Sequence, residues 1–101
     1  DAIVASQREL MEETGIDAQN WELLGKTRVC NGLLTEWQST YLAQGITVTD
    51  AKRDANDEIL VPEGKFVSLE SVHALISRGE INDGQSLAGL YLLEQWITRQ
   101  E

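Results

Sequence analysis

Several residue types are scarce in this chain, and each scarcity excludes something. Its 101 residues include one cysteine, one proline and one histidine. The single cysteine, Cys30, has no partner for an intramolecular disulfide, which fits a reducing compartment, and we therefore expect a cytoplasmic protein. No apolar run approaches the roughly 18 residues that a membrane-spanning helix needs, so we expect no membrane partner.

Basic residues are also scarce, at 8 lysines and arginines against 17 aspartates and glutamates, and the formal net charge is −9. Nucleic-acid phosphates and anionic lipid surfaces attract basic faces, so this balance argues against both as partners. What the chain does contain is typical of a folded protein, with 42% hydrophobic and 25% charged residues. Its length suits one domain or part of one.

The most informative stretch is residues 8–16, which carries three carboxylates on a predicted helix. Residues four apart lie on the same side of a helix, so Glu9 and Glu13 stack, and Glu12 lies beside them. Each such like-charged pair costs about 0.2–0.5 kcal/mol. We expect Gly15 to end the helix by adopting positive φ, which leaves the carboxylates at the negative end of the helix dipole. A sequence selected only for helix stability would avoid this arrangement.

Two interpretations of this cluster follow from the residues alone. Three glutamates fit a solvated acidic helix face. They also fit a site for a hard divalent cation, because Mg²⁺ takes oxygen ligands and is often held by one or two carboxylates together with substrate phosphates. A bound cation would turn both electrostatic penalties into attractions.

The whole string of residues 8–16 resembles the second half of the Nudix box, Arg-Glu-apolar-x-Glu-Glu-x-Gly-apolar, without a mismatch. The resemblance implies an α/β fold, the Nudix-type α/β/α sandwich. It also implies a hydrolase that cuts the pyrophosphate of a nucleoside diphosphate linked to another moiety, with Mg²⁺ or Mn²⁺ as cofactor. In this reading Glu9, Glu12 and Glu13 are metal ligands. Arg8 orients a box carboxylate through an ion pair. The matching residues are Arg8, Glu9, Leu10, Glu12, Glu13, Gly15 and Ile16.

The family's box begins with a glycine and a glutamate that lie upstream of its arginine. The position of that glutamate falls immediately before Asp1. We therefore expect residues 1–101 to be the C-terminal part of a single Nudix hydrolase domain, with the N-terminal part of its mixed sheet missing. We expect this truncated chain to be inactive by itself.

The later part of the chain resembles the ADP-ribose pyrophosphatase branch of the family. In that branch a loop supplies an acidic residue that positions or deprotonates the attacking water, and here Asp57 matches first and Glu58 second. A solvated acidic loop explains these two residues equally well. Glu36 matches an acidic residue that the branch carries before its next strand, which implies a role in substrate binding. The stretches that carry this resemblance are residues 57–59, 66–70, 76–83 and 86–88.

One departure from the branch leaves the substrate open. The branch often has a proline beyond the box as a substrate marker, whereas this chain has Asn31-Gly32 there and its single proline is Pro62. We therefore expect ADP-ribose or another nucleoside diphosphate sugar as the substrate, and a homodimer as the assembly. The alternative is a non-catalytic Nudix-like module that binds a nucleotide or dimerises, or an inactive fragment.

Periodicity and capping residues predict three helices. The first covers residues 1–14, and the second runs from Ser68 to Arg78. Gly79 is expected to end the second helix. The predicted third helix is capped by Asn82 or Asp83 and ends at about residue 100.

Between these helices the sequence predicts strands and loops. Cys30, at the end of a predicted strand, is interpreted as a small buried hydrophobe, and His73 as a structural or exposed residue of the second helix. The predicted segments are a loop at residues 17–20, strands at 21–30 and 37–43, a loop at 49–58, a strand at 59–61 and a turn at 61–64.

Overall fold

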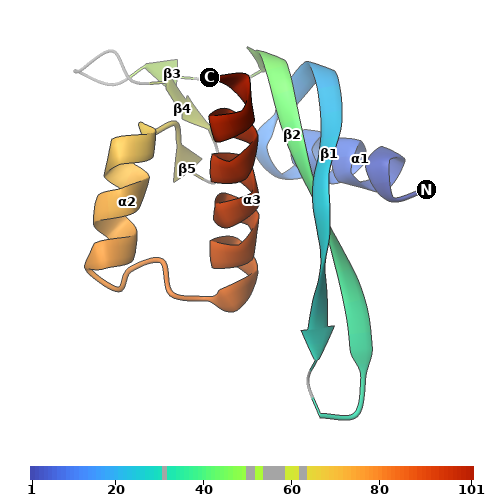
Figure 1. Cartoon of the computed structure of the whole chain (residues 1–101). Coiled ribbons are helices and arrows are strands. Elements are labelled where there is room, and N and C mark those ends of the chain that lie inside the picture. Colours follow the sequence, from blue (N-terminus) through green and yellow to red (C-terminus); the bar gives the residue numbers. More distant parts are fainter. Residues whose placement is uncertain (31, 50–51, 54–58, 62–63) are drawn as a thin grey trace. The chain divides into compact units, whose positions relative to one another are not determined.

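The computed structural model describes residues 1–30, 32–49, 52–53, 59–61 and 64–101 (Figure 1). The described part is mixed α/β, as the sequence predicted at that coarse level. The chain divides into two compact units, Asp1–Trp21 with Ala43–Ser68 and Glu22–Leu42 with Leu69–Glu101, and each is considered by itself. In chain order the elements are α1 (Ala2–Thr14), β1 (Ile16–Cys30), β2 (Thr35–Val48), β3 (Lys52–Arg53), β4 (Ile59–Val61), β5 (Gly64–Lys65), α2 (Leu69–Ser77) and α3 (Gly84–Gln100).

Helix α1 matches its predicted range to within one residue. The Asp1 carboxylate accepts a hydrogen bond from the Ile3 amide at 3.0 Å, which satisfies one donor left without an intrahelical partner. At the other end Gly15 has a φ of 71°, and its amide donates to the Met11 carbonyl at 2.9 Å. The helix ends there because glycine has no Cβ to oppose positive φ.

Thr49 joins the end of α1 to the far end of β2 within the first unit. Its amide and its hydroxyl both donate to the Gly15 carbonyl, at 2.8 and 2.7 Å. Ile16 follows the glycine and is 7% exposed, and it is the one buried hydrophobic residue among residues 1–30, 32–49 and 65–101, whose burial the structure describes. A buried side chain therefore follows directly on the glycine that ends α1.

Strands β1 and β2 form a two-stranded antiparallel sheet (Figure 1). The predicted loop at residues 17–20 is wrong, because these residues belong to β1. Asp17 and Gln19 are exposed while Ala18 between them is half-buried, so the polar side chains occupy the outward side of a strand. β2 is also longer than the predicted strand at residues 37–43.

Strands β3, β4 and β5 form a second antiparallel sheet in the first unit. Lys52 pairs with Leu60, so the predicted loop at residues 49–58 is wrong at β3. The predicted strand at residues 59–61 is confirmed as β4. Val61 pairs with Gly64, which agrees with the predicted turn, although Pro62 and Glu63 lie outside the described residues.

In the second unit, α2 ends at a left-handed glycine, as predicted. Gly79 has a φ of 77°, and its amide donates to the Ile76 carbonyl at 3.0 Å. The Glu80 amide reaches back to the Leu75 carbonyl at 2.9 Å. These two bonds form a Schellman motif, which satisfies carbonyls that the helix end leaves free.

Helix α3 begins at one of its two predicted caps. The Asp83 carboxylate accepts a hydrogen bond from the Ser86 amide at 2.9 Å, so Asp83 is the N-cap. Asn82 instead donates from Nδ2 to the Gly79 carbonyl at 2.9 Å, which closes the connection from α2.

Helix α3 packs on the portion of the sheet that belongs to the second unit. A Cβ added to Gly25 of β1 would lie 3.0 Å from a methyl carbon of Leu92, so the glycine lets the helix approach the strand closely. The Trp96 Nε1 donates to the Glu22 Oε2 at 3.1 Å, and this bond links the same two elements. Packing of α3 is thus set by a small residue and by polar links.

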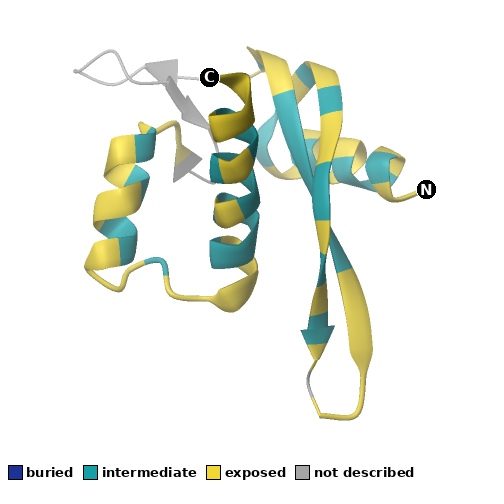
Figure 2. Ribbon diagram, in the orientation of Figure 1, coloured by how far each residue is buried: buried dark blue, intermediate teal, exposed yellow. Residues whose placement is uncertain are grey.

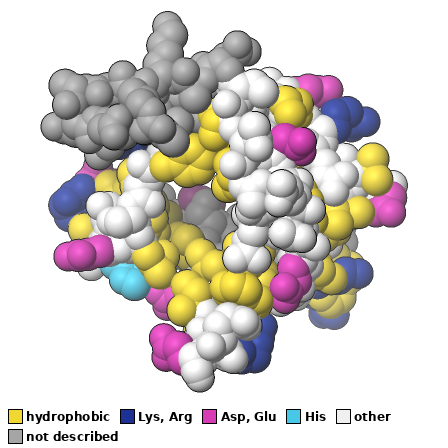
Figure 3. Space-filling view, turned by 90° about the horizontal axis from the view of Figure 1, so that it is seen from above, with side chains coloured by type: hydrophobic (Ala, Val, Ile, Leu, Met, Phe, Trp, Pro, Cys, Tyr) yellow, Lys and Arg dark blue, Asp and Glu magenta, His cyan; other side chains and the backbone are white. Residues whose placement is uncertain are grey.

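Hydrophobic side chains stay widely exposed in both units (Figures 2 and 3). Leu33 is 98% exposed, and Trp37 and Tyr91 are each 62% exposed. Large hydrophobic side chains are therefore at the surface as well as in the half-buried positions of both units. No helix within the described ranges is long and apolar enough to cross a membrane.

Candidate functional site

Helix α1 places the three predicted metal ligands near its C-terminal end. Glu9, Glu12 and Glu13 are all exposed. The helix brings Glu9 and Glu13 onto one side, one turn apart, as their spacing predicted. The last turn carries no basic residue, so the negative end of the helix dipole and the carboxylates add their charges.

Arg8 lies next to one of these carboxylates. Its Nε is 3.9 Å from the Glu12 Oε1, and both side chains are about two-thirds exposed, at 65% and 66%. An exposed pair at this spacing contributes about 0.3–0.5 kcal/mol, because water screens it. The contact gives Arg8 a defined carboxylate neighbour without neutralising Glu9 or Glu13.

The chemistry of the donor set fits a hard divalent cation, since all three side chains offer carboxylate oxygens. Across the part of the chain that the structure describes, however, no three His, Cys, Asp or Glu side chains are gathered closely enough to hold a metal ion. Mutual repulsion spreads exposed carboxylates in the absence of a counter-charge. The three glutamates therefore share a helix end and a side without forming a closed cage.

The backbone behind the carboxylates is held tightly. A Cβ on Gly15 would lie 2.8 Å from the Thr49 carbonyl oxygen and 2.9 Å from its hydroxyl oxygen. Only glycine fits both this contact and the positive φ. Glu12 and Glu13 consequently project from a helix end whose position is fixed by Gly15 and Thr49.

The other predicted site residues are distributed differently. Asp57 and Glu58, the predicted catalytic acids, lie outside the described residues. Glu36, the predicted substrate-binding residue, is exposed near the start of β2 and belongs to the second unit. The described residues thus bring together the metal-ligand candidates and Arg8 on α1.

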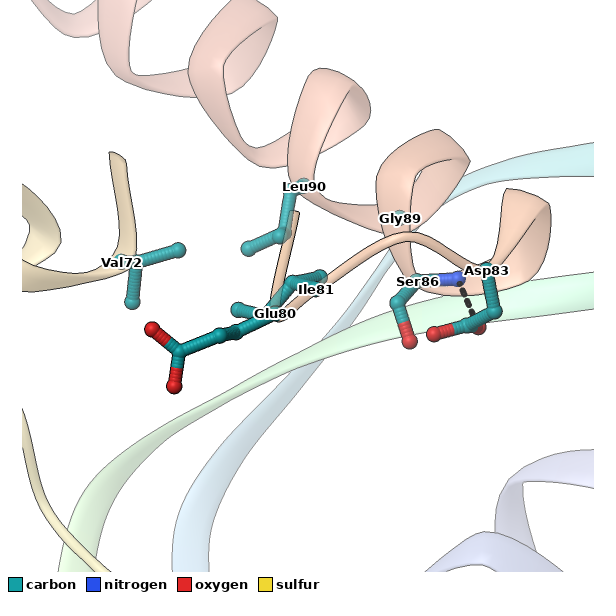
Figure 4. A pocket seen from close by; sticks show the side chains of 7 residues that line it. All are labelled: Val72, Glu80, Ile81, Asp83, Ser86, Gly89 and Leu90. Carbon is teal, nitrogen blue, oxygen red and sulfur yellow. Dashed lines mark hydrogen bonds between the residues drawn. The ribbon is translucent and has the colours of Figure 1, made fainter. Parts of the chain in front are cut away.

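The second unit has a cavity of about 440 Å³ between α2, the 78–83 connection and α3 (Figure 4). Its wall is apolar at Val72 and Leu90, and the Glu80 side chain extends below Val72. None of the predicted site residues lines it. The remaining lining residues are Ile81, Asp83, Ser86 and Gly89.

Both carboxylates that line this cavity already have partners. Glu80 accepts from the Arg78 Nε at 2.6 Å. Hydrogen bonds from Ser86, first from its amide and then from its hydroxyl, lower the pKa of Asp83 below its ordinary value. The sequence predicted the connection between the two helices, from the glycine that ends α2 and the aspartate that caps α3. It could not predict the cavity, because a cavity between helices depends on how they pack.

Cys30 and His73 were both assigned structural roles from the sequence. The interpretation of Cys30 as buried is wrong, because the residue is exposed at the end of β1, with its Sγ 3.8 Å from the Thr35 hydroxyl. His73 is exposed and its Nε2 contacts the Glu94 carboxylate, so it bridges α2 and α3 as a structural residue does.

A comparison with protein-family models, with curated proteins and with solved structures finds no match to this chain. The Nudix resemblance therefore depends on residues 8–16 and on the later stretches quoted from the sequence.

Proposed function

We propose that this chain forms part of a Nudix-type hydrolase. The proposed reaction is cleavage of the pyrophosphate bond in a nucleoside diphosphate linked to another moiety, such as ADP-ribose or another nucleoside diphosphate sugar. The proposed fold is the α/β/α sandwich of that family, of which the helices and strands described above are a part. The cofactor is Mg²⁺ or Mn²⁺.

The observation that carries the proposal is the unbroken match at residues 8–16 on a helix that ends where the motif requires. The motif's glycine, Gly15, is the left-handed end of α1. The carboxylates of Glu9 and Glu13 have no hydrogen-bond or ion-pair partner among the described residues, so both keep their oxygens available. Uncompensated like charges at a helix C-terminus cost stability, and a bound cation is the simplest compensation.

Each site residue has a role in this proposal. A divalent cation supplies charge neutralisation for the anionic pyrophosphate and lowers the pKa of water. Glu9, Glu12 and Glu13 would hold that cation, and Arg8 would keep Glu12 oriented. The remaining roles are proton removal from the attacking water, by Asp57 or Glu58, and contact with substrate, by Glu36.

Metal titration tests the proposal directly. Calorimetry with Mg²⁺ and Mn²⁺ compares the parent chain with the double variant Glu9→Gln plus Glu13→Gln. Removing two anionic ligands should weaken binding by roughly tenfold or more, because affinity follows the charge of the ligand set. Glu70→Gln, on the exposed first turn of α2, is the matched control and should bind like the parent. Unchanged affinity in the double variant would sink the proposal.

The alternative is a non-catalytic module that binds a nucleotide. Binding of ADP-ribose to the full-length protein, measured by calorimetry and run beside a hydrolysis assay with Mn²⁺, separates the two. Binding without turnover, in a full-length protein that also fails to bind the metal, selects the module.

A further inference from the structure

We propose that an extended acidic segment of another protein binds in the groove between the open edge of β1 and the start of α3. The segment adds a strand to β1, so that its acidic side chains lie beside Lys26 and Arg28, and an apolar side chain enters the cavity beside Thr27. This binding is independent of the proposed hydrolase activity, because none of the predicted site residues lines the groove.

The open edge of β1 is the first observation. Among the described residues β1 is hydrogen-bonded to β2 alone. Along the second-unit portion of the strand, residues 22–30, the other edge therefore carries backbone N–H and C=O groups without a strand partner. In Figure 1 the end of this portion lies on the α3 side of the hairpin. Such an edge is a template for an added strand, because its donors and acceptors are already aligned.

A cavity of about 390 Å³ lies along this edge and forms the groove. It is lined by residues 27–30 of β1 and by Gly84, Gln85 and Ala88 of α3, whereas no described residue of β2 lines it. The Gln38 Nε2 donates to the Gln85 carbonyl at 3.2 Å, which fixes the start of α3 on the sheet. The groove is therefore bounded by a strand edge and by a helix whose position is set.

Alternation along β1 sorts the side chains that an added strand would meet. Thr27 and Val29 are half-buried, and Gly25, two residues before Thr27, lies against Leu92 of α3. These three residues of β1 face α3, so side chains of an added strand that point the same way enter the cavity. The intervening residues are exposed and point to the opposite side of the strand.

That opposite side of the sheet is basic, although the chain as a whole has a formal net charge of −9. The Arg28 guanidinium carbon lies 5.0 Å from the ring centroid of Trp37, so both residues are on this side. Glu22 does not neutralise it, because its Oε2 accepts from Trp96 of α3. None of the described residues that alternation places on this side is acidic. They are Lys26, Arg28, Cys30, Thr35, Trp37, Ser39 and Tyr41.

Lys26 and Arg28 are both available to an acidic partner. No ion pair between described residues involves either of them. Trp37 is 62% exposed, so the stacked pair of Arg28 and Trp37 is at the surface. Stacking occupies the face of the guanidinium and restrains it, and this leaves its edge for a carboxylate, which a guanidinium binds in its own plane.

These observations specify the chemistry of the partner segment. Its backbone pairs with the edge of β1, and acidic residues at alternate positions lie beside Lys26 and Arg28, while the residues between them are apolar and face α3. Backbone hydrogen bonds then supply affinity, and the cavity and the two bases supply specificity. A nucleic acid or an anionic lipid surface would use the bases but neither the strand edge nor the cavity, so the observations favour a peptide.

Fluorescence anisotropy with labelled peptides tests the proposal on the full-length protein. The first probe is a peptide of about seven residues in which glutamate and valine alternate, the second has lysine in place of each glutamate, and the third has proline at its centre. The glutamate peptide should bind. The lysine peptide should bind at least about tenfold more weakly, because like charges would lie side by side. The proline peptide should also bind at least about tenfold more weakly, because proline interrupts strand pairing.

Two variants assign the binding to this groove. Lys26→Glu should weaken binding of the glutamate peptide at least about tenfold and strengthen binding of the lysine peptide, a reversal that loss of folding cannot produce. Ala88→Leu fills part of the cavity, so it should weaken binding of the glutamate peptide more than binding of a peptide in which serine replaces each valine. Circular dichroism confirms that each variant is folded.

The control makes the same change in net charge elsewhere. Arg99→Glu, exposed in the last turn of α3, should bind every peptide like the parent. A parent that binds none of the peptides overturns the proposal and assigns Lys26 the role of preventing edge pairing. If such a parent also self-associates and Lys26→Glu abolishes this in sedimentation, a second copy covers the edge instead. Equal binding of the glutamate and lysine peptides, or an unchanged preference in Lys26→Glu, overturns the proposal too.

Discussion

Helices α1 and α3 differ in the charges that they carry at their C-terminal ends. Asp83 caps the N-terminus of α3 and Arg99 lies in its last turn, so both ends carry the charge that the dipole favours. Asp1 caps α1 in the same favourable way, but Glu12 and Glu13 occupy its last turn and no base is present there. The contrast is therefore confined to one helix end.

In α3 the charges at both ends stabilise the helix, whereas the charges at the C-terminal end of α1 destabilise it. α3 is fastened to β1 through Trp96 and Glu22, and its capping chemistry adds to that stability. The end of α1 is equally well fixed in its backbone, through Gly15 and Thr49, yet its charges work against it. Natural proteins depart from favourable helix-end charges mainly at functional or strained sites. The unfavourable charges at the end of α1 therefore support placing the functional site there.

The largest expected effect is on the turnover number of the full-length protein. It compares the predicted catalytic acids with Asp83, the acid that caps α3. Asp57→Asn or Glu58→Gln should lower kcat by about 10²–10⁴, because loss of a general base typically has that effect. Asp83→Asn should leave kcat unchanged, since asparagine still caps α3. Steady-state kinetics with ADP-ribose and Mn²⁺ gives the comparison. If neither the Asp57 nor the Glu58 substitution changes kcat by more than a few-fold, the general base is elsewhere.

The next largest effect compares the glycine at the end of α1 with the glycine at the end of α2. Gly15→Ala should lower the free energy of unfolding by about 2–4 kcal/mol, because left-handed strain adds to a close contact with Thr49. Gly79→Ala should cost about 1–2 kcal/mol, since a Cβ there meets no atom within 4 Å and only the strain remains. Urea denaturation measures both. Equal losses of unfolding free energy in the two variants would show that Thr49 moves aside without cost.

The pH dependence of stability isolates the favourable end of α3. The pKa of Asp83 is lowered from 3.8 by Ser86, so its stabilisation is present above that value and is lost as pH falls through the lower, folded-state pKa. The melting temperature should therefore fall more steeply between pH 5 and pH 2 in the parent than in Asp83→Asn. The two proteins should have similar melting temperatures at pH 7. If the melting temperatures of the two proteins change in parallel down to pH 2, Asp83 does not contribute to the pH dependence of stability.

The smallest effect reverses sign between the two helices. Glu13→Gln should raise the free energy of unfolding by a few tenths of a kcal/mol, because it removes repulsion from Glu9 and an unfavourable dipole contact. Arg99→Gln should lower it by a similar amount. Low-salt urea titrations resolve the difference, and high salt should remove it. A loss of stability in Glu13→Gln would contradict the view that the end of α1 is strained.

The sequence predicted some features of the candidate site but not others. The helix, its side-by-side glutamates and its glycine end follow from residues 8–16, because each depends on neighbours within about one helical turn. Whether those glutamates gather around a cation depends on a counter-charge that no sequence pattern supplies, and the described residues show no gathered group. Arg8 was expected to meet a box carboxylate, and the structure places its Nε beside Glu12.

The sequence by itself determined the helix ends of this protein. Gly15, Gly79 and Asp83 act on their own backbone or on residues at most a turn away, so local chemistry suffices. Tertiary structure alone decided that residues 17–20 extend β1 and that Cys30 is exposed. Strand pairing and burial depend on partners far along the chain, and a single residue's type carries little information about where those partners lie.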